Sequence, residues 1–260
     1  MKYLTYTRAE FLRGMRYRAN YWATLTSSLI MTLIQWYLWT AVYRHTDSIA
    51  GVGFSSMLSY SLMGRVASGF LAEPANLRIG PRVRQGTIVH DLVKPTDLHY
   101  QLLFQSLGSA LFRLVSTGLP LLLVLLAAGR IRFPGAGATV AFVLSLFMGY
   151  ITVFSTSFLS GVLTFYTKSG VGIDHLYTLV EFFSGMYVPL QFFPGRLRAV
   201  AERLPFKAIH YIPMAIWSGM TGPGEVAPAI LSQVAWTALM VLLCRAVWSG
   251  AVRHLTVQGG

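Results

Sequence analysis

Long runs without a single charged residue dominate this chain. No Lys, Arg, Asp or Glu occurs among the 25 residues between Arg18 and Arg44, the 35 residues from 133 to 167, or the 19 residues from 226 to 244. A helix needs about 20 predominantly apolar residues to cross the hydrocarbon core of a bilayer. Each of these three runs therefore predicts a transmembrane helix.

Three further apolar segments each contain a charged residue. Arg65 interrupts the first of them, Arg113 the second and Glu181 the third. Together with the uncharged runs, they predict transmembrane helices at residues 21–43, 52–72, 102–128, 139–163, 173–188 and 226–247. The sequence thus predicts an all-α integral membrane protein with six transmembrane helices, in which residues 1–260 form a single domain.

The first 20 residues predict an amphipathic helix on the membrane surface. Apolar and basic side chains are interspersed there: Leu4, Phe11, Leu12 and Met15 among Lys2, Arg8, Arg13, Arg16 and Arg18. Such a helix lies in the interface with its apolar side chains in lipid and its arginines on the head groups. An unstructured basic tail is the alternative interpretation.

Residues 189–222 predict a re-entrant helical hairpin on the extracytoplasmic side. Pro194 can occupy the first turn of a helix, and Pro205 ends it. Between them, Leu197, Val200, Ala201 and Leu204 share one helical face. The apolar stretch at 211–220 that follows is too short to span. Non-helical backbone at membrane depth is tolerated only against protein, so this region is expected to dip in and return.

The polar segment at residues 73–100 predicts a short amphipathic helix between the second and third spans. Gly86 precedes this helix, Pro95 ends it, and Thr96 is placed to cap the next one. One face is apolar and the other polar: Ile88, Val89, Leu92 and Val93 against His90, Asp91 and Lys94. Such a helix suits docking against a soluble partner, and an ordinary interfacial loop helix is the alternative.

Charge supports a membrane protein and predicts its orientation. Only 12% of the residues are charged, against roughly a quarter in soluble domains. Placing both termini inside assigns 12 Lys and Arg residues to the cytoplasmic side and 7 to the other, the bias expected of cytoplasmic flanks. The formal net charge of +12 does not indicate nucleic-acid binding, because no basic cluster lies in a soluble domain.

The sequence offers no catalytic or metal-binding constellation. Cys244 is the single cysteine, and the six histidines and nine acids are dispersed without metal-ligand spacing. No G-x-x-x-x-G-K-[ST] phosphate loop occurs, so this chain does not cradle ATP in the usual way. Charges inside spans remain candidate functional groups, so Arg65, Arg113 and Glu181 are expected either to line a translocation path or to form a buried charge pair.

Two stretches resemble type-2 ABC exporter permeases. The run RIGPRVRQGTIVHDLVKPTDLHYQLL (78–103) has a Gly-x4-Asp-Leu-x2-Pro core that resembles the cytoplasmic loop of that family. The run FFSGMYVPLQFFPGRLRAVAERLPFKAIHYIPMAIWSG (182–219) resembles the family's outer motif. The matching positions are Gly86, Asp91, Leu92 and Pro95 in the loop, and Pro189, Pro194, Pro205 and Pro213 in the outer motif.

This resemblance implies a transport role and a set of partners. The chain would be the permease of an ABC exporter in the bacterial cytoplasmic (inner) membrane, paired with a second permease, the same or homologous. A separate nucleotide-binding ATPase subunit would carry ATP–Mg, with no cofactor on this chain. Gly86, Asp91, Leu92, Lys94 and Pro95 would form the ATPase-coupling helix.

Two other classes of protein fit the sequence less well than an exporter does. A secondary transporter or channel not coupled to ATP is the alternative, but residues 1–130 and 131–260 show no convincing internal repeat. A membrane-embedded enzyme would need clustered catalytic groups, which the pattern lacks.

Overall fold

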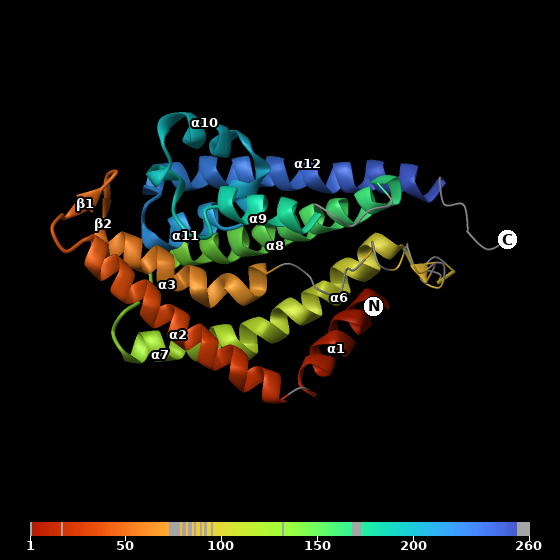
Figure 1. Ribbon diagram of the computed structural model, residues 1–260, viewed down its shortest axis with the longest axis horizontal. Coiled ribbons are helices and arrows are strands. Elements are labelled where there is room, and N and C mark those ends of the chain that lie inside the picture. Colours follow the sequence, from red (N-terminus) through yellow and green to blue (C-terminus); the bar gives the residue numbers. More distant parts are fainter. Residues whose placement is uncertain are drawn as a thin grey trace.

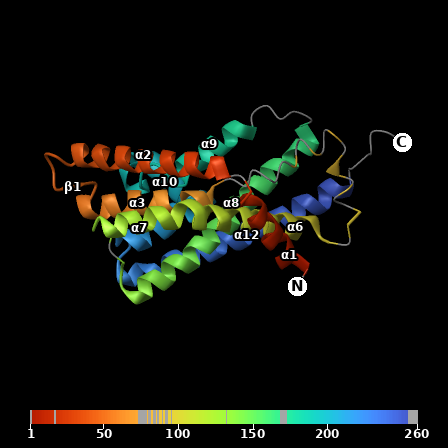
Figure 2. The same cartoon turned by 90° about the horizontal axis from the view of Figure 1, so that it is seen from below.

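The protein is an elongated bundle of helices in the computed structural model (Figure 1). The structure describes residues 2–16, 18–72, 79, 82, 85, 87, 88, 90, 93, 94, 96–131, 133–167 and 173–253. Both ends of the chain lie at one end of the bundle, and the β1–β2 hairpin lies at the other (Figures 1 and 2). The two ends of the bundle therefore differ in the segments that they carry.

The first long helix leads into a tight hairpin. Helix α2 spans Arg18–Val42, and strands β1 (Ser48–Ile49) and β2 (Val52–Gly53) pair in antiparallel register. Ala50 and Gly51 form the two-residue turn with φ of 51° and 79°, the left-handed conformation that such turns require. The Tyr43 hydroxyl donates to the Val52 carbonyl at 2.9 Å and ties the helix to the hairpin.

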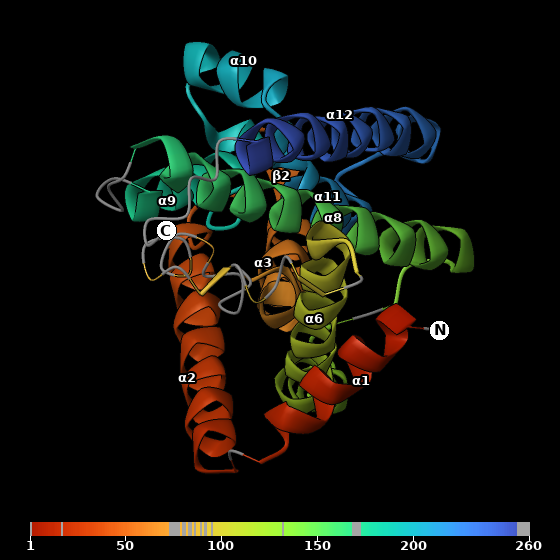
Figure 3. The ribbon, with the colours of Figure 1, turned by 90° about the vertical axis from the view of Figure 1, so that its right-hand side faces the viewer.

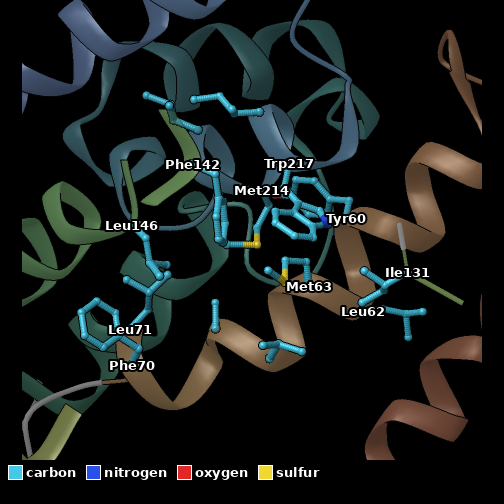
Figure 4. Close-up of a cluster of buried hydrophobic side chains, with 14 of the residues drawn as sticks. Tyr60, Leu62, Met63, Phe70, Leu71, Ile131, Phe142, Leu146, Met214 and Trp217 are labelled. Atoms are coloured by element: carbon cyan, nitrogen blue, oxygen red, sulfur yellow. The ribbon is translucent and has the colours of Figure 1, made fainter. Parts of the chain in front are cut away.

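Helix α3, Phe54–Leu71, lies at the centre of the bundle. Viewed along the long axis, α2, α6 (Leu98–Arg113) and α8 (Ala136–Thr167) surround it (Figure 3). Its buried side chains, including Tyr60, Met63 and Phe70, pack against Phe142 of α8 and Trp217 of α11, Tyr211–Ser218 (Figure 4). Because protein rather than lipid surrounds α3, it tolerates more serines and glycines than the outer helices do.

The third predicted span is a helix with a wide turn at its centre. Helix α6 continues through a π-helical segment, Leu114–Gly118, into α7, Leu119–Ala127. Pro120 lies in the first turn of α7, lacks an N–H to donate, and crowds the carbonyl four residues earlier. A π turn accommodates both effects without breaking the helix. At this level α3 comes close, since a Cβ on Gly118 would collide with the Val66 carbonyl.

Helices α8 and α12 (Val226–Arg253) run side by side and share a polar seam (Figure 1). Gln233 exchanges hydrogen bonds with Ser145, Thr152 with Thr237, and Cys244 donates to the Ser155 carbonyl at 3.2 Å. Hydroxyl, amide and thiol groups between helices are a common device in membrane proteins, where apolar contact alone gives helices little preference for each other over lipid.

The segment between α8 and α12 is a chain of short helices. They are α9 (Ile173–Phe183), a 3-10 turn at Leu190–Phe192, α10 (Gly195–Arg203), a second at Pro205–Ala208, α11 (Tyr211–Ser218) and a third at Pro223–Glu225. Gly219 ends α11 in the left-handed conformation with φ of 72°. The helix predicted between Pro194 and Pro205 is confirmed as α10.

Four helices of the described chain are long and apolar enough to cross a membrane: Tyr21–Val42, Leu98–Ala127, Ala136–Leu163 and Pro223–Ala251. They coincide with the first, third, fourth and sixth predicted spans, so the protein is an all-α, multi-pass membrane protein. The fifth predicted span, at 173–188, was too long. Helix α9 ends at Phe183, and eleven residues rise only about 16 Å, roughly half of the hydrocarbon core.

Candidate functional site

Arg65 and Glu181 approach each other through a tyrosine. The Tyr187 hydroxyl donates to Glu181 Oε2 at 3.0 Å, and the Arg65 guanidinium interacts electrostatically with the same tyrosine. Arg65 comes from the middle of α3, Glu181 from the last turns of α9, and Tyr187 from the turn beyond α9. We call these three residues the Arg65–Tyr187–Glu181 group.

The predicted ion pair between Glu181 and an arginine is wrong as a direct contact. Among the described residues, no ion pair joins Glu181 to Arg65 or to Arg113. Tyr187 occupies the position next to the carboxylate, and its ring is 54% exposed. Arg65 Nε is buried, and no described group accepts a hydrogen bond from it. The group therefore keeps a donor unused, which an oxyanion or carbonyl of a passing molecule could satisfy.

Arg113 takes a structural part instead. Its Nε donates to the Gly69 carbonyl at 2.6 Å, close to the C-terminal end of α3. A Cβ added at Gly69 would lie 3.2 Å from the Cβ of Arg113, which explains why residue 69 is glycine. Carbonyls in the last turn of a helix have no partner within the helix, and a guanidinium satisfies one of them here. Arg113 thus joins α6 to α3.

The turn after α9 is fixed by hydrogen bonds from α3 and from α11. Tyr60 of α3 donates to the Gly185 carbonyl at 2.6 Å, and the Tyr211 N–H donates to the Ser184 carbonyl at 2.8 Å. Gly185 has φ of 81°, and an added Cβ would lie 3.0 Å from the Tyr60 hydroxyl. This position requires glycine for both its conformation and its close packing. The turn that presents Tyr187 is therefore held rigidly on α3.

His210 supports the same turn as a neutral ring. Burial lowers the pKa of His210 to about 4, and its Nδ1 lies 2.9 Å from Ser184 Oγ. The single hydroxyl proton of Ser184 is directed at the Glu181 carbonyl, 2.6 Å away. The Ser184 oxygen therefore accepts from His210, which places the imidazole proton on Nδ1. The sequence motif containing these residues did not reveal this bond.

Polar contacts also order the outer surface of this region. Gln191 donates to the Tyr211 hydroxyl at 2.7 Å, and Arg198 pairs with Glu202 at 2.7 Å along α10. The hydrogen bond to Glu202 raises the pKa of Arg198. Gln233 of α12 donates to the Ala208 carbonyl at 2.7 Å. The short helices are thus fastened to both α3 and α12.

At the opposite end of the bundle, α6 begins at an ion pair. Asp97 accepts a hydrogen bond from the Tyr100 N–H at 3.3 Å and caps the helix, one residue later than the predicted cap Thr96. The other Asp97 oxygen lies 2.7 Å from Arg245 Nη1, near the end of α12. The Arg245 guanidinium also lies 4.8 Å from the centre of the Tyr100 ring. The segment at 73–100 therefore ends on a joint between two helices.

Helix α1 (Lys2–Gly14) packs along α6 beside this joint. Thr7 Oγ1 donates to the Phe104 carbonyl at 2.8 Å, and the Tyr3 and Phe104 rings stack at 5.5 Å. A Cβ on Gly108 would collide with the Thr7 carbonyl, so glycine allows the two backbones to touch. Leu4 of α1 remains 62% exposed on another face, as a lipid-facing side chain would be. The predicted N-terminal helix is thus present and rests on α6.

Most of the predicted coupling residues lie outside the described chain. Gly86, Asp91, Leu92 and Pro95 are not described, and Lys94 is exposed. Of the predicted apolar face, Ile88 and Val93 belong to the described residues, and their surroundings differ. Ile88 is 2% exposed and packs in a cluster with Phe154, Phe158 and Trp248, whereas Val93 is 79% exposed. Part of that face is therefore used by the protein's own core, because α8 and α12 extend to the same level.

The described residues contain no group of three or more His, Cys, Asp or Glu side chains placed to hold a metal ion. A family model described as an ABC-2 family transporter protein matches residues 29–259. No curated protein and no solved structure matches the chain. The matched range begins inside α2 and covers α3 to α12, including both ends of the bundle and the Arg65–Tyr187–Glu181 group. The chain therefore belongs to the ABC-2 family of transporter proteins.

Proposed function

We propose that this chain is the permease subunit of an ATP-driven exporter whose ATPase is a separate polypeptide. The observation that carries the proposal is the family match, which extends over almost the whole chain. The absence of a phosphate-binding loop in the sequence agrees with ATP–Mg on a partner. In this role the chain has no catalytic residues of its own. The match favours an ABC transporter over a secondary transporter or channel.

The proposed topology has six membrane segments and both termini in the cytoplasm. The segments are α2, α3, α6 with α7, α8, α9 and α12. Support comes from the bundle itself, because α1, the described residues between 79 and 96, and the end of α12 lie at one end, away from the β1–β2 hairpin (Figures 1 and 2). The two short helices α10 and α11 fit a re-entrant region, which would complete the outer half of the membrane segment above α9. The membrane would be the bacterial inner membrane.

Coupling is proposed to enter through residues 86–95. The chain leaves this segment at Asp97, which binds both the first turn of α6 and Arg245 of α12. A displacement of the segment would therefore move α6 together with α1, and pull on α12. The π-helical turn at Leu114–Gly118 packs against α3 and is placed to pass that movement on. A movement at the cytoplasmic end would then reach the helix that carries Arg65.

The Arg65–Tyr187–Glu181 group is proposed to line the translocation path. It joins the central helix to α9 and the outer turn, and it combines a buried unused donor with an exposed tyrosine. Helix α2, which packs against α3, exposes apolar side chains such as Leu33, Ile34 and Leu38. These would face lipid or a second permease, the same chain or a homologous one. The path would then lie where two permeases meet.

Reconstitution tests the proposal directly. The permease would be purified with its native ATPase partner and placed in proteoliposomes with a panel of amphiphilic dyes. We expect ATP-dependent movement away from the side that carries the ATPase. A Walker-B Glu→Gln variant of the ATPase should abolish it. Movement that persists without ATP and follows an ion gradient would contradict the proposal and favour a secondary transporter.

A further inference from the structure

A cavity of about 1030 Å³ opens at the end of the bundle that carries the β1–β2 hairpin. Its walls come from the first turns of α3, the loop between α7 and α8 with the start of α8, the end of α11 and the start of α12. It is separate from the Arg65–Tyr187–Glu181 group, none of whose residues lines it.

The wall carries several open hydrogen-bond donors. The start of α8 contributes residues 135–138, and no described group accepts a hydrogen bond from the N–H of Ala136, Gly137 or Ala138. Three open N–H groups at the positive end of a 32-residue helix favour an anion. Ser55 and Ser59 add two hydroxyls from α3. The N-terminus of α8 alone would not indicate a binding site, but further donors line the same cavity.

A cation and an unpaired indole lie on the same wall. Arg130 forms no ion pair with a described acid, and its guanidinium lies 3.9 Å from the centre of the Trp36 ring, which orients it. Trp217 is 97% buried beside the cavity, and its Nε1 has no acceptor among the described groups. Buried donors are normally paired, so an absent acceptor is the expected partner.

No acid opposes these donors within the cavity. None of the described residues that line it is Asp or Glu. Glu225, close by in sequence, turns away to accept from the Gly222 N–H at 3.4 Å. A cationic ligand would find no carboxylate among these described lining residues, whereas an oxyanion would be met by a guanidinium, hydroxyls and backbone N–H groups.

The remaining wall is apolar and the volume is large. Leu58, Phe133, Ile216 and Val226 line it. A free phosphate would occupy a small part of 1030 Å³, a volume at the upper end for small-molecule sites. We propose that the cavity binds an anionic amphiphile, with its phosphate or similar oxyanion at Arg130 and the α8 N-terminus and its apolar part along the other wall. The proposal does not depend on ATP coupling.

Binding by the purified full chain in neutral detergent tests this assignment. The probes are dihexanoyl phosphatidic acid, dihexanoyl phosphatidylcholine and inorganic phosphate, measured through tryptophan fluorescence. We expect the anionic lipid to bind at least about tenfold more tightly than the zwitterionic one, the factor that a lost charge-assisted hydrogen bond produces. Inorganic phosphate should compete only weakly, because it leaves the apolar wall empty.

Variants separate the site from general charge effects. Arg130→Gln should weaken binding of the anionic lipid about tenfold, and Arg130→Lys should restore most of it. Arg196→Gln, which removes an exposed cation of α10, is the matched control and should leave binding unchanged. Thermal unfolding of each variant identifies any loss of fold. If Arg130→Gln does not fold, the affinity of Arg130→Lys for the anionic lipid tests the proposal in its place.

Three results would overturn the proposal. Equal affinity for the two lipids would contradict the anion preference, and an unchanged affinity in Arg130→Gln would contradict its location. Inorganic phosphate binding as tightly as the lipid would contradict the amphiphile. If the site holds, ATP-driven transport of phosphatidic acid would identify it as cargo, and its absence would identify a resident bilayer lipid. Neither outcome affects the binding measurement itself.

Discussion

Arg245 Nη1 lies 2.7 Å from Asp97 Oδ2, so the end of α12 is joined to the first turn of α6. The two side chains are 43% and 37% exposed, and an exposed pair of this kind contributes at most about 1 kcal/mol to stability. Its importance is therefore positional. Asp97 is the residue at which the chain leaves the proposed coupling segment and becomes helix α6.

The two roles of Asp97 can be separated by substitution. Asp97→Asn keeps an oxygen for the cap and removes the ion pair, whereas Asp97→Ala removes both. We expect Asp97→Ala to cost about 1 kcal/mol more than Asp97→Asn, the usual contribution of an N-cap. Thermal unfolding in detergent measures this difference. Arg245→Gln should match Asp97→Asn, and equal losses in Asp97→Asn and Asp97→Ala would show that the cap contributes nothing.

The Arg65–Tyr187–Glu181 group predicts stable but transport-deficient variants. Glu181→Gln keeps an acceptor for the Tyr187 hydroxyl, so it should cost less than about 1 kcal/mol of stability, not the 3–5 kcal/mol of a broken buried ion pair. Arg65→Gln should lower the transport rate roughly tenfold, the effect of one lost charge-assisted contact. Melting temperature and transport, measured on the same preparation, give both quantities.

A matched change on the same helix controls for Arg65. Ser68→Ala, which removes a hydroxyl bonded to the Arg65 carbonyl within α3, should leave transport unchanged. A loss of stability in Glu181→Gln that an additional Arg65→Gln restores would contradict this account. That result would show a direct ion pair after all.

Gln233 is expected to matter most for folding. It is fully buried and bonds Ser145 of α8 and the Ala208 carbonyl, so Gln233→Leu leaves polar groups of two elements unpaired. We expect a loss of about 2–4 kcal/mol. Leu231→Ala on the same helix, at a side chain that is 70% exposed, is the control and should be nearly neutral. Comparable melting temperatures for the two variants would refute the role of the seam.

Cysteine labelling in intact cells tests the proposed topology. In a Cys244→Ala background, single cysteines at Arg13, Arg84 and Arg253 should be protected from an impermeant thiol reagent, because the proposed topology places these positions in the cytoplasm. One at Arg198 should react, since α10 belongs to the outer region. Reaction at Arg84 without permeabilisation would reverse the assignment of the two sides.

The long apolar runs, three of them uncharged and one containing Arg113, were sufficient to predict four spans because they carry their own signal. Hydropathy reports transfer into lipid, and the helices at Tyr21–Val42 and Ala136–Leu163 present many side chains to the outside. Helix α3 was predictable as a helix but not as the centre of the bundle. Its position depends on which helices pack around it, and a single sequence does not state that.

The end of α9 and the contacts of Glu181 could not be predicted from the sequence. Helix α9 ends just before Gly185, against which Tyr60 and Tyr211 pack, and both tyrosines are distant in sequence. Glu181 was expected to meet an arginine because opposite charges in spans usually pair, and Tyr187 took that place. A tyrosine six residues after an acid carries no sequence signal of this kind.

The most direct test of the central claim is a double change in the segment before Asp97. Asp91→Lys with Leu92→Asp reverses one charge and removes an apolar anchor worth about 2–3 kcal/mol. We predict that this variant inserts and folds, but loses co-purification with the ATPase or hydrolyses ATP without export. Arg196→Glu with Arg198→Glu, in the outer region, should keep both the association and coupled export. Wild-type ATPase binding and export in the Asp91 and Leu92 variant would contradict the proposal that this segment couples the permease to ATP.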